Sequence, residues 1–171
     1  MHRDKHESPL ELSFDIVEME LADINDLMEI ERLSFPTPWS KNFFVKEYHS
    51  RYSKVFLAKS RHPDKQKVLG YICLWFVFDE VHILNIACHP HFRRQKVATA
   101  LLEHCLLLSF DNGTRKVFLE VREANDGART LYARCGFKPI GLRKGYYTDT
   151  REDAIVMFLE MKAPFSFTSE H

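Results

Sequence analysis

The stretch NIACHPHFRRQKVATALLEHC, Asn85 to Cys105, decides the fold class of this chain. It opens with the apolar and β-branched residues of a strand, turns through a basic segment and continues with the apolar spacing of a helix. Free backbone N–H groups and the helix dipole make the start of such a helix a site for anions. The segment RRQKVA, Arg93–Ala98, is spaced like a phosphate-binding loop, with Lys96 where glycine is usual. Spacing alone favours a solvated turn, but the strand before it and the helix after it favour an anion site.

Regular patterns on both sides of this stretch predict the remaining elements. Alternating apolar residues predict strands, and apolar residues three or four apart predict helices. Asp23, Ser40 and Asn125 are placed to cap the start of three helices, and Gly113 and Gly136 to end two. The order β-α-α-β-β-β-α-β-α-β-β predicts an α/β domain around one mixed sheet. The predicted strands are Phe14–Leu21, Lys54–Ser60, Lys67–Phe78, Val81–Cys88, Lys116–Arg122, Ile140–Tyr147 and Glu152–Met161, and the first helix is expected to bury Ile24, Leu27, Met28 and Leu33.

The composition is that of an ordinary globular domain. The chain has 171 residues, enough for one domain with a sizeable core, and 45% apolar with 28% charged residues argues against disorder. Residues 14–162 are expected to form this domain, between polar tails at 1–13 and 163–171. The formal net charge is zero, so no whole-molecule field would recruit nucleic acid or an anionic membrane.

The sequence predicts no targeting or membrane segment. Its beginning, MHRDKHESPLELSF, lacks the apolar core of a signal peptide, and the longest apolar run, Val68–Phe78, is too short to span a bilayer. The cysteines form no CxxC pair, which argues against a zinc knuckle or a dithiol redox site. We expect all four cysteines to be free thiols, namely Cys73, Cys88, Cys105 and Cys135. Free thiols are typical of a reducing compartment, so we expect a cytoplasmic protein.

Three histidines raise the question of a metal site. His89 and His91 form an H-x-H turn, and His82 lies in the strand before it. No carboxylate follows at the spacing of a metal ligand, so no metal is expected.

The chain resembles the GNAT family of acetyl-CoA-dependent N-acetyltransferases. The pyrophosphate loop of that family reads R/Q-x-x-G-x-G/A, and Arg93 fits its first position, Ala98 its last, while Lys96 replaces its first glycine. The segments LNIACHPHFRRQKVATALLEH, LEVREANDGARTLYARCGF, GYYTDTREDAIVM and FPTPWS resemble the ribosomal-protein alanine N-acetyltransferase (RimI) branch, over roughly Phe14 to Met161. The resemblance implies one GNAT-type domain, with a mostly antiparallel sheet of about seven strands flanked by about four helices. It also implies that acetyl-CoA is bound by Ile86, Ala87, Cys88, Arg93, Arg94, Gln95, Lys96, Val97, Ala98, Thr99 and Asn125.

Lys96 is the main departure from the family pattern. If its position requires a positive φ, a lysine there costs about 1 kcal/mol or slightly more. If φ is helical, the lysine costs nothing sterically and its ammonium can lie beside the diphosphate. The first positions of a helix have ordinary helical angles, so the sequence favours the second account.

The chemistry implied by the resemblance uses one carboxylate and one phenol. Acetyl transfer from a thioester to an amine needs a base for the amine, donors for the oxyanion and a proton for the departing thiolate. The resemblance implies that Glu120 is the base; alternation alone would make it a solvent-facing strand carboxylate, although Phe118 shares its face. It implies that Tyr132 is the acid; without the resemblance a core aromatic is the better interpretation. A phenol with a pKa of about 10 is protonated at pH 7 and can donate to a thiolate.

The acceptor side is expected at FPTPWS and GYYTDTRED, with Trp39, Tyr146 and Tyr147 as walls, although paired tyrosines are more often plain strand residues. The resemblance implies a protein N-terminus that begins with alanine, in that family the end of a small-subunit ribosomal protein. An α-amine has a pKa of about 7.7–8.0 and a lysine amine about 10.4, so near pH 7 the neutral fraction of the α-amine is larger by a factor on the order of a hundred. A single carboxylate such as Glu120 can therefore complete its deprotonation.

Two other functions remain open from the sequence. The first is a GNAT enzyme that acetylates a lysine or a small amine. The second is a catalytically silent module that binds acyl-CoA and regulates a partner through its altered loop. Retention of Glu120, Asn125 and Tyr132 together argues against the silent module.

Overall fold

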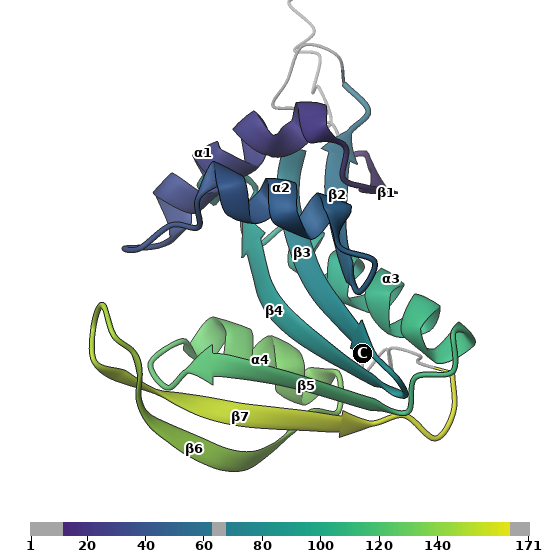
Figure 1. Cartoon of the computed structure of the whole chain (residues 1–171), viewed down its shortest axis with the longest axis vertical. Helices are drawn as coiled ribbons and strands as arrows, with labels where there is room; N and C mark the ends of the chain where they lie inside the picture. Colours follow the sequence, from purple (N-terminus) through teal and green to yellow (C-terminus); the bar gives the residue numbers. More distant parts are fainter. Residues whose placement is uncertain (1–11, 63–67, 165–171) are drawn as a thin grey trace, which may run out of the picture.

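The computed structural model describes residues 12–62 and 68–164, and these form one α/β unit (Figure 1). The described elements follow the predicted order, and the strand Phe14–Leu21 is shorter than expected because it ends at Glu18. The predicted tails lie largely outside the described residues, as does part of the turn between the second and third strands. The strands are β1 Phe14–Glu18, β2 Ser53–Ser60, β3 Val68–Val77, β4 Glu80–Cys88, β5 Lys116–Arg122, β6 Lys138–Tyr147 and β7 Glu152–Glu160, and the helices are α1 Ile24–Ser34, α2 Lys41–His49, α3 Val97–Asp111 and α4 Asp126–Arg134.

The described strands form one sheet in the order β1-β2-β3-β4-β5-β7-β6. Every neighbouring pair is antiparallel except β4 and β5, which confirms the mixed, mostly antiparallel sheet. The parallel pair is short: its register runs from Glu80 opposite Lys116 to Ile83 opposite Leu119 and stops there. Beyond this point β4 and β5 diverge (Figure 1). The site described below lies where these two strands separate.

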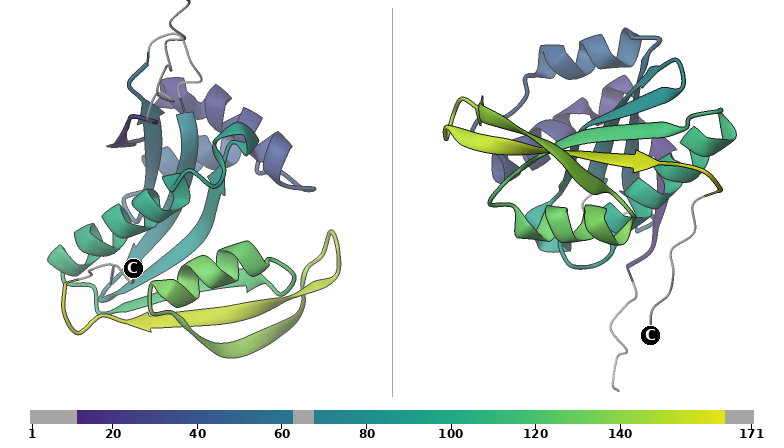
Figure 2. Two further views of the ribbon diagram at one scale, coloured as in Figure 1. Left: turned by 180° about the vertical axis from the view of Figure 1, so that it is seen from behind. Right: turned by 90° about the horizontal axis from the view of Figure 1, so that it is seen from below.

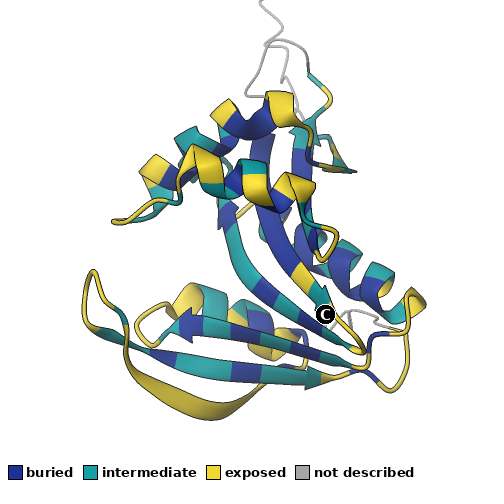
Figure 3. Cartoon of the chain, in the orientation of Figure 1, coloured by how far each residue is buried: buried dark blue, intermediate teal, exposed yellow. Residues whose placement is uncertain are grey.

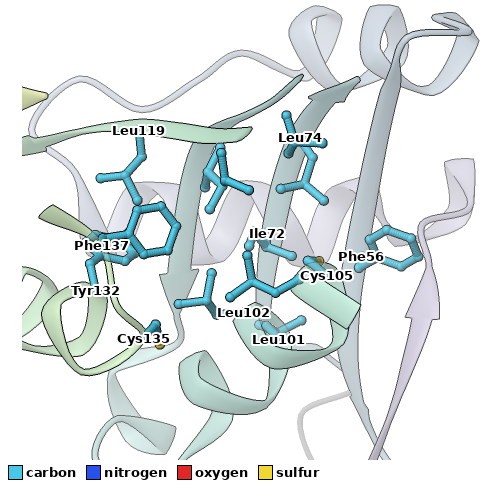
Figure 4. Close-up of a cluster of buried hydrophobic side chains, with 14 of the residues drawn as sticks. Phe56, Ile72, Leu74, Leu101, Leu102, Cys105, Leu119, Tyr132, Cys135 and Phe137 are labelled. Carbon is cyan, nitrogen blue, oxygen red and sulfur yellow. The ribbon is translucent and has the colours of Figure 1, made fainter. Parts of the chain in front are cut away.

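Helices cover both faces of the sheet. α1 and α2 lie on one face and α3 and α4 on the other, as the view from below shows (Figure 2). Two apolar cores result, since each helix pair buries its own stripe against the strands. The larger core joins α3 and α4 to β5 (Figures 3 and 4). Val117, Leu119 and Val121 of β5 are buried and point into this core.

The helix boundaries agree with all five predicted capping positions. Ser40 Oγ accepts a hydrogen bond from the Phe43 N–H at 3.2 Å, and Asn125 Oδ1 accepts one from the Ala128 N–H at 3.1 Å. Gly113 and Gly136 follow α3 and α4 with φ of +88° and +91°, the left-handed conformation in which glycine has no steric cost.

Asp23 occupies the N-cap position of α1, as predicted, but its side chain makes no capping hydrogen bond to this helix. It belongs to a short 3-10 helix, Leu21–Asp23, and its Oδ2 instead accepts from the Glu20 N–H at 2.9 Å. Its other oxygen pairs with Lys59 of β2 at 2.7 Å. The prediction that Leu33 is buried was also wrong. At 3.6 residues per turn Leu33 lies about half a turn away from Ile24, so it is on the opposite side of α1 and is 52% exposed, whereas Glu31 lies on the buried side.

Candidate active site

A cavity of about 480 Å³ lies where β4 and β5 separate. Its walls come from the α1–α2 loop, from Leu84–Ile86 of β4, from Glu120–Arg122 of β5, from the start of α4 and from the turn between β6 and β7. The structure thus brings together residues that the sequence placed more than a hundred positions apart. The predicted site residues among its lining are Trp39, Ile86, Glu120, Asn125, Tyr132, Tyr146 and Tyr147.

Glu120 reaches this cavity because of strand alternation. Its neighbours Leu119 and Val121 point into the core, so Glu120 and Arg122 point to the opposite face of β5. β5 has already lost β4 as a partner at this position, which leaves space beside the carboxylate. Glu120 Oε1 lies 3.3 Å from a guanidinium nitrogen of Arg143, a residue of the edge strand β6 that is more than half exposed. The carboxylate is therefore partly exposed and borders the cavity, where it can accept a hydrogen bond from a bound ligand.

Tyr132 enters the cavity from α4 on the other side. The side chain is only 4% exposed, and its ring packs against Phe137 with centroids 5.8 Å apart (Figure 4). Burial raises the pKa of this phenol, so it stays protonated at neutral pH. Among the residues that the structure describes, its hydroxyl has no hydrogen-bond partner. The ring is therefore a core aromatic, and the acid role of the hydroxyl stays a prediction.

Arg122 fixes the turn between β6 and β7. Its guanidinium donates to both carboxylate oxygens of Asp149, at 2.9 and 3.2 Å, and to Glu152 at 3.2 Å. It also lies over the ring of Tyr147, 4.0 Å from the centroid. The hydrogen bond from Arg122 lowers the pKa of Asp149, and a further one from the Thr37 side chain lowers it as well. Because Thr37 lies in the α1–α2 loop, Asp149 joins the two loops of the acceptor side.

The cavity is acidic. Four carboxylates line it, against the single guanidinium of Arg122. One of their oxygens, Oε2 of Glu152, is buried and has no hydrogen-bond partner among the described residues. Such a lining favours a ligand that carries positive charge or N–H donors. The four are Glu31, Glu120, Asp149 and Glu152.

Glu31 is the site residue that sequence reasoning missed. Its side chain is fully buried and accepts from Tyr71, from Asn85 at 3.3 Å and from the Trp39 N–H at 2.6 Å. Burial raises the pKa of Glu31, against the lowering effect of the Tyr71 and Trp39 hydrogen bonds. A signal was available: Ile24, Leu27 and Glu31 are spaced by three and four residues, so the glutamate lies on the apolar stripe of α1.

The Arg93–Thr99 loop lies at the start of α3, outside the lining of the cavity. Arg94 and Lys96 both have φ of +63°, so the expectation of a helical Lys96 was wrong. The chain leaves the short 3-10 helix Pro90–Phe92 and must change direction before α3 begins at Val97, which is buried. The left-handed conformation of Lys96 makes this change of direction. A left-handed conformation at a residue other than glycine lowers the stability of the fold by about 1–2 kcal/mol.

Two contacts hold this loop in place. The Arg93 side chain donates to the Cys88 carbonyl at 3.3 Å and to Ser34 Oγ, at the end of α1, at 3.2 Å. The first described helical bond of α3 runs from the Ala100 N–H to the Lys96 carbonyl at 2.9 Å. The N–H groups of Val97–Thr99 therefore precede the helical ladder, as an anion site at a helix N-terminus requires. Ala87 and Cys88 follow Ile86 in β4, toward this loop, and neither lines the cavity.

The histidines and cysteines have ordinary structural surroundings. His82 stacks on Phe118 with centroids 5.3 Å apart, and His89 Nδ1 accepts from the His91 N–H at 3.3 Å. Among residues 12–62 and 68–164, no three His, Cys, Asp or Glu side chains are grouped as metal ligands would be. The four cysteines are free thiols, as predicted, and burial raises the pKa of Cys88, in β4 before the loop, to about 11. No described helix combines the length and the apolar character needed to cross a membrane.

Comparisons with known proteins agree with one another. The model of the acetyltransferase (GNAT) family matches residues 24–137, more than half of the chain. The ribosomal protein bS18-alanine N-acetyltransferase of Escherichia coli (strain K12) is 34% identical over 146 residues, which cover 84% of this chain and 95% of that protein. A protein of Bacillus subtilis (strain 168), whose name gives the same activity provisionally, is 37% identical over 141 residues, with 82% and 91% covered.

Solved structures share this fold. The crystal structure of the ribosomal-protein-S18-alanine N-acetyltransferase from Escherichia coli has a TM-score of 0.78 at 32% identity, and the match covers 93% of this chain and 98% of that one. Arabidopsis thaliana NAA60 in complex with acetyl-CoA has a TM-score of 0.80 at 19% identity, which shows the fold alone.

Proposed function

This chain belongs to the acetyltransferase (GNAT) family, and we propose that it transfers an acetyl group from acetyl-CoA to the N-terminal α-amine of a protein. The names of its relatives give an alanine of ribosomal protein S18 as the acceptor. We propose the α-amine of an alanine-starting small-subunit ribosomal protein as the acceptor of this chain. The observation that carries the proposal is the acidic cavity with Glu120 on one wall and Tyr132 on the other. Because an N-terminal ammonium is the cationic form of the acceptor, an acidic lining favours its entry.

Glu120 is the proposed base and Tyr132 the proposed acid. A proton passes from the acceptor ammonium to Glu120, and the neutral amine attacks the thioester carbonyl. The new N–C bond forms, the C–S bond breaks, and the departing thiolate takes a proton from the Tyr132 hydroxyl. The nitrogen gives up its second proton as the amide forms, this proton returns through water to the Tyr132 phenolate, and Glu120 releases its proton to solvent. Backbone N–H groups of Ile86–Cys88 are proposed to stabilise the oxyanion. The accessible carboxylate and the unpartnered phenol support these two roles.

Acetyl-CoA is proposed to bind along β4 with its diphosphate against the Arg93–Thr99 loop. The N–H groups at the start of α3 supply donors there, and the exposed Arg94 and Lys96 supply positive charge. Gln95 donates its side-chain amide to the His91 carbonyl at 3.0 Å and so contributes to the loop shape. Asn125 caps α4 through its Oδ1, which leaves its amide N–H groups available to the coenzyme. Thermal shift with acetyl-CoA against dephosphorylated pantetheine tests the loop, since equal stabilisation by both would remove the diphosphate from this account.

The acceptor walls are proposed to be Trp39, Tyr146 and Tyr147. All three line the cavity, and Tyr147 is held there by Arg122. They belong to the two loops that Thr37 and Asp149 join, so the acceptor would lie between an indole and a pair of phenols.

One experiment separates the proposed acceptor from a lysine. A peptide that begins with Ala is incubated with acetyl-CoA and the chain, beside the same peptide with a blocked N-terminus and an internal lysine. We expect acetylation of the first at its α-amine and none of the second, read by mass spectrometry. Label mainly on the lysine would instead assign the chain to the lysine or small-amine enzymes. Binding of acetyl-CoA without any transfer would favour the silent regulatory module.

A further inference from the structure

Within the part of the chain that the structure describes, Glu31 is a buried carboxylate that forms no ion pair with a basic side chain. Its exposed fraction is zero, and its recorded hydrogen-bond donors, Tyr71, Asn85 and the Trp39 N–H, are all neutral. Burial of a charge without a countercharge costs several kcal/mol unless hydrogen bonds compensate it. Both oxygens accept hydrogen bonds and no acceptor faces them, so the group fits its site as an ionised carboxylate. An apolar residue on this stripe of α1 would avoid that cost, which points to a role other than stability.

The three donors belong to three different parts of the site. Tyr71 lies in β3, Asn85 lies in β4, and Trp39 lies in the α1–α2 loop. Asn85 also donates to the Tyr71 hydroxyl at 2.9 Å, which closes the network. The Trp39 N–H bond, at 2.6 Å, is the short link between the loop and the sheet. Glu31 therefore ties the loop to two strands at one point.

Asn85, one of the donors to Glu31, lies beside a β-bulge in β4. Cys73 pairs with Asn85 and Leu74 with Ile83, so Leu84 is an extra residue in β4. This bulge turns β4 at the place where the strand leaves β5. Ile86 follows directly after Asn85. Asn85 is thus fixed immediately before the strand segment proposed to hold the thioester.

We propose that Glu31 is a positioning residue for the acceptor: it holds the Trp39 wall at a set distance from the thioester segment of β4. This role rests on the proposed function. The carboxylate does not touch the reacting atoms. It acts through Trp39 and Asn85, whose separation sets the space in which the acceptor binds between the α1–α2 loop and β4. Loss of this spacing should weaken the binding of the peptide before transfer, which raises its Km and leaves kcat unchanged.

The test is Glu31→Gln, which keeps the shape and removes the charge. A glutamine presents one acceptor and one donor, while Glu31 faces N–H or O–H donors on both oxygens. Either orientation therefore places a donor against a donor, at Trp39 or at Tyr71. We expect the Km for an Ala-starting peptide to rise by about 10- to 100-fold, while kcat and the Km for acetyl-CoA stay within about threefold. Tyr71→Phe removes one donor only and should show a smaller change in the same direction.

The matched control is Glu47→Gln. Glu47 is also a buried glutamate, on α2, and accepts from Trp75 Nε1 at 2.7 Å, but it does not line the cavity. A glutamine can turn its oxygen toward this single donor. We expect Glu47→Gln to leave the peptide Km unchanged. A rise in Km equal to that of Glu31→Gln would show a general effect of neutralising a buried glutamate and would overturn the proposal.

Hydrogen exchange at the Trp39 amide gives a readout that does not depend on activity. In the free chain we expect Glu31→Gln to lose most of the protection of this amide, with the thermal midpoint within about 5 °C of the parent. Unchanged protection would show that Glu31 does not hold the loop. Lost protection with an unchanged peptide Km would show that the loop does not position the acceptor. If the parent chain acetylates no N-terminal peptide, the proposed function and the acceptor role of Glu31 are both overturned. The exchange data would still show whether Glu31 holds the α1–α2 loop against β3 and β4.

Discussion

The acceptor side of the cavity and the Arg93–Thr99 loop are held in place by opposite means. On the acceptor side, the buried Glu31 and the half-buried Arg122 each collect several hydrogen bonds, and Asp149 joins the two loops. The Arg93–Thr99 loop is exposed, has two left-handed residues that are not glycine and is tied mainly through Arg93. One region is ordered by polar side chains and the other by backbone geometry. Ordering in advance reduces the entropy lost on binding, so the two regions should respond differently to substitution.

The largest expected effect is that of Tyr132→Phe. The substitution removes the proposed proton donor and leaves the ring in its core contacts. General acid catalysis is worth about 10²- to 10⁴-fold, so kcat should fall by that factor, with both Km values nearly unchanged. Steady-state kinetics with peptide and acetyl-CoA varied separately measures this, and the urea midpoint checks the fold. An unchanged kcat would return Tyr132 to a purely structural role, and a large change in the Km for acetyl-CoA would move it to the coenzyme region.

Gly70→Ala should weaken the frame beneath the Arg93–Thr99 loop. A Cβ at this position of β3 would lie 2.8 Å from the Ala87 carbonyl oxygen, 3.1 Å from Val97 Cγ1 and 3.2 Å from Cys88 Sγ. Since the first of these is backbone, strand or helix must shift, and we expect a loss of about 1–3 kcal/mol in the free energy of unfolding. Urea unfolding measures it. Gly141→Ala, where a Cβ would meet no atom within 4 Å, is the control. An equal loss in both variants would show that close packing at Gly70 is not the cause.

Lys96→Gly tests the strain in the loop itself. Glycine removes the steric cost of φ +63° but loses more conformational entropy on folding, so we expect a gain of at most about 1 kcal/mol in the free energy of unfolding. Acetyl-CoA binding should stay within a few-fold, because a charge contact is exchanged for a closer backbone. Lys96→Ala keeps the strain and removes the charge, which separates the two contributions. Complete loss of binding in Lys96→Gly would show that the ammonium, rather than the N–H groups, holds the diphosphate.

The smallest expected effect is a difference in pH dependence between two carboxylates of the acceptor side. Asp149 has a lowered pKa, so its contribution to stability is present above the ordinary pKa of about 3.9 and is lost as the pH falls further. Glu31 has a raised pKa, so its contribution is greatest below about pH 4.3 and is lost as the pH rises toward the folded-state value. Urea unfolding of Asp149→Asn and Glu31→Gln between about pH 3 and pH 7 measures both.

The two variants should therefore diverge from the parent in opposite directions. The stability deficit of Asp149→Asn should shrink as the pH falls below about 4, and Glu31→Gln should gain relative to the parent as the pH rises. Parallel curves for the two variants would contradict the opposite pKa shifts and the different environments behind them.

Much of the fold was predictable because it depends on local patterns. Alternation placed Val117, Leu119 and Val121 in the core and Glu120 on the opposite face, and strand positions settle such a choice without knowledge of partners. The capping predictions for Ser40, Asn125 and Gly136 were confirmed for the same reason. A helix cap involves contacts within about one turn of the chain, so it depends on the local sequence. The capping bond predicted for Asp23 was wrong because its side chain pairs with Glu20, in the preceding turn, and with Lys59, on another strand.

The candidate site was predictable in its membership more than in its arrangement. The resemblance selected Glu120, Tyr132 and Asn125, which line one cavity, although their proposed roles await the experiments above. It gave no indication of Glu31, whose place on the apolar stripe of α1 indicates burial but not its partners, because these come from other elements. The conformation of Lys96 was also missed, since φ there is set by where α3 must start relative to β4.

The family resemblance selected Glu120, Tyr132 and the Arg93–Thr99 loop as candidates for a base, an acid and an anion site. The sequence by itself determined the order of elements and the alternation within each strand. These depend on spacing along the chain, which fixes which side chains share a face. Only the tertiary structure decided that β4 and β5 part after Ile83 and Leu119, that Glu31 meets Tyr71, Asn85 and Trp39, and that Asp149 reaches Thr37. Each of these contacts joins residues from different elements. Their formation depends on how the helices and strands pack together, because burial and hydrogen bonding over such separations are properties of the assembled core and not of any one segment.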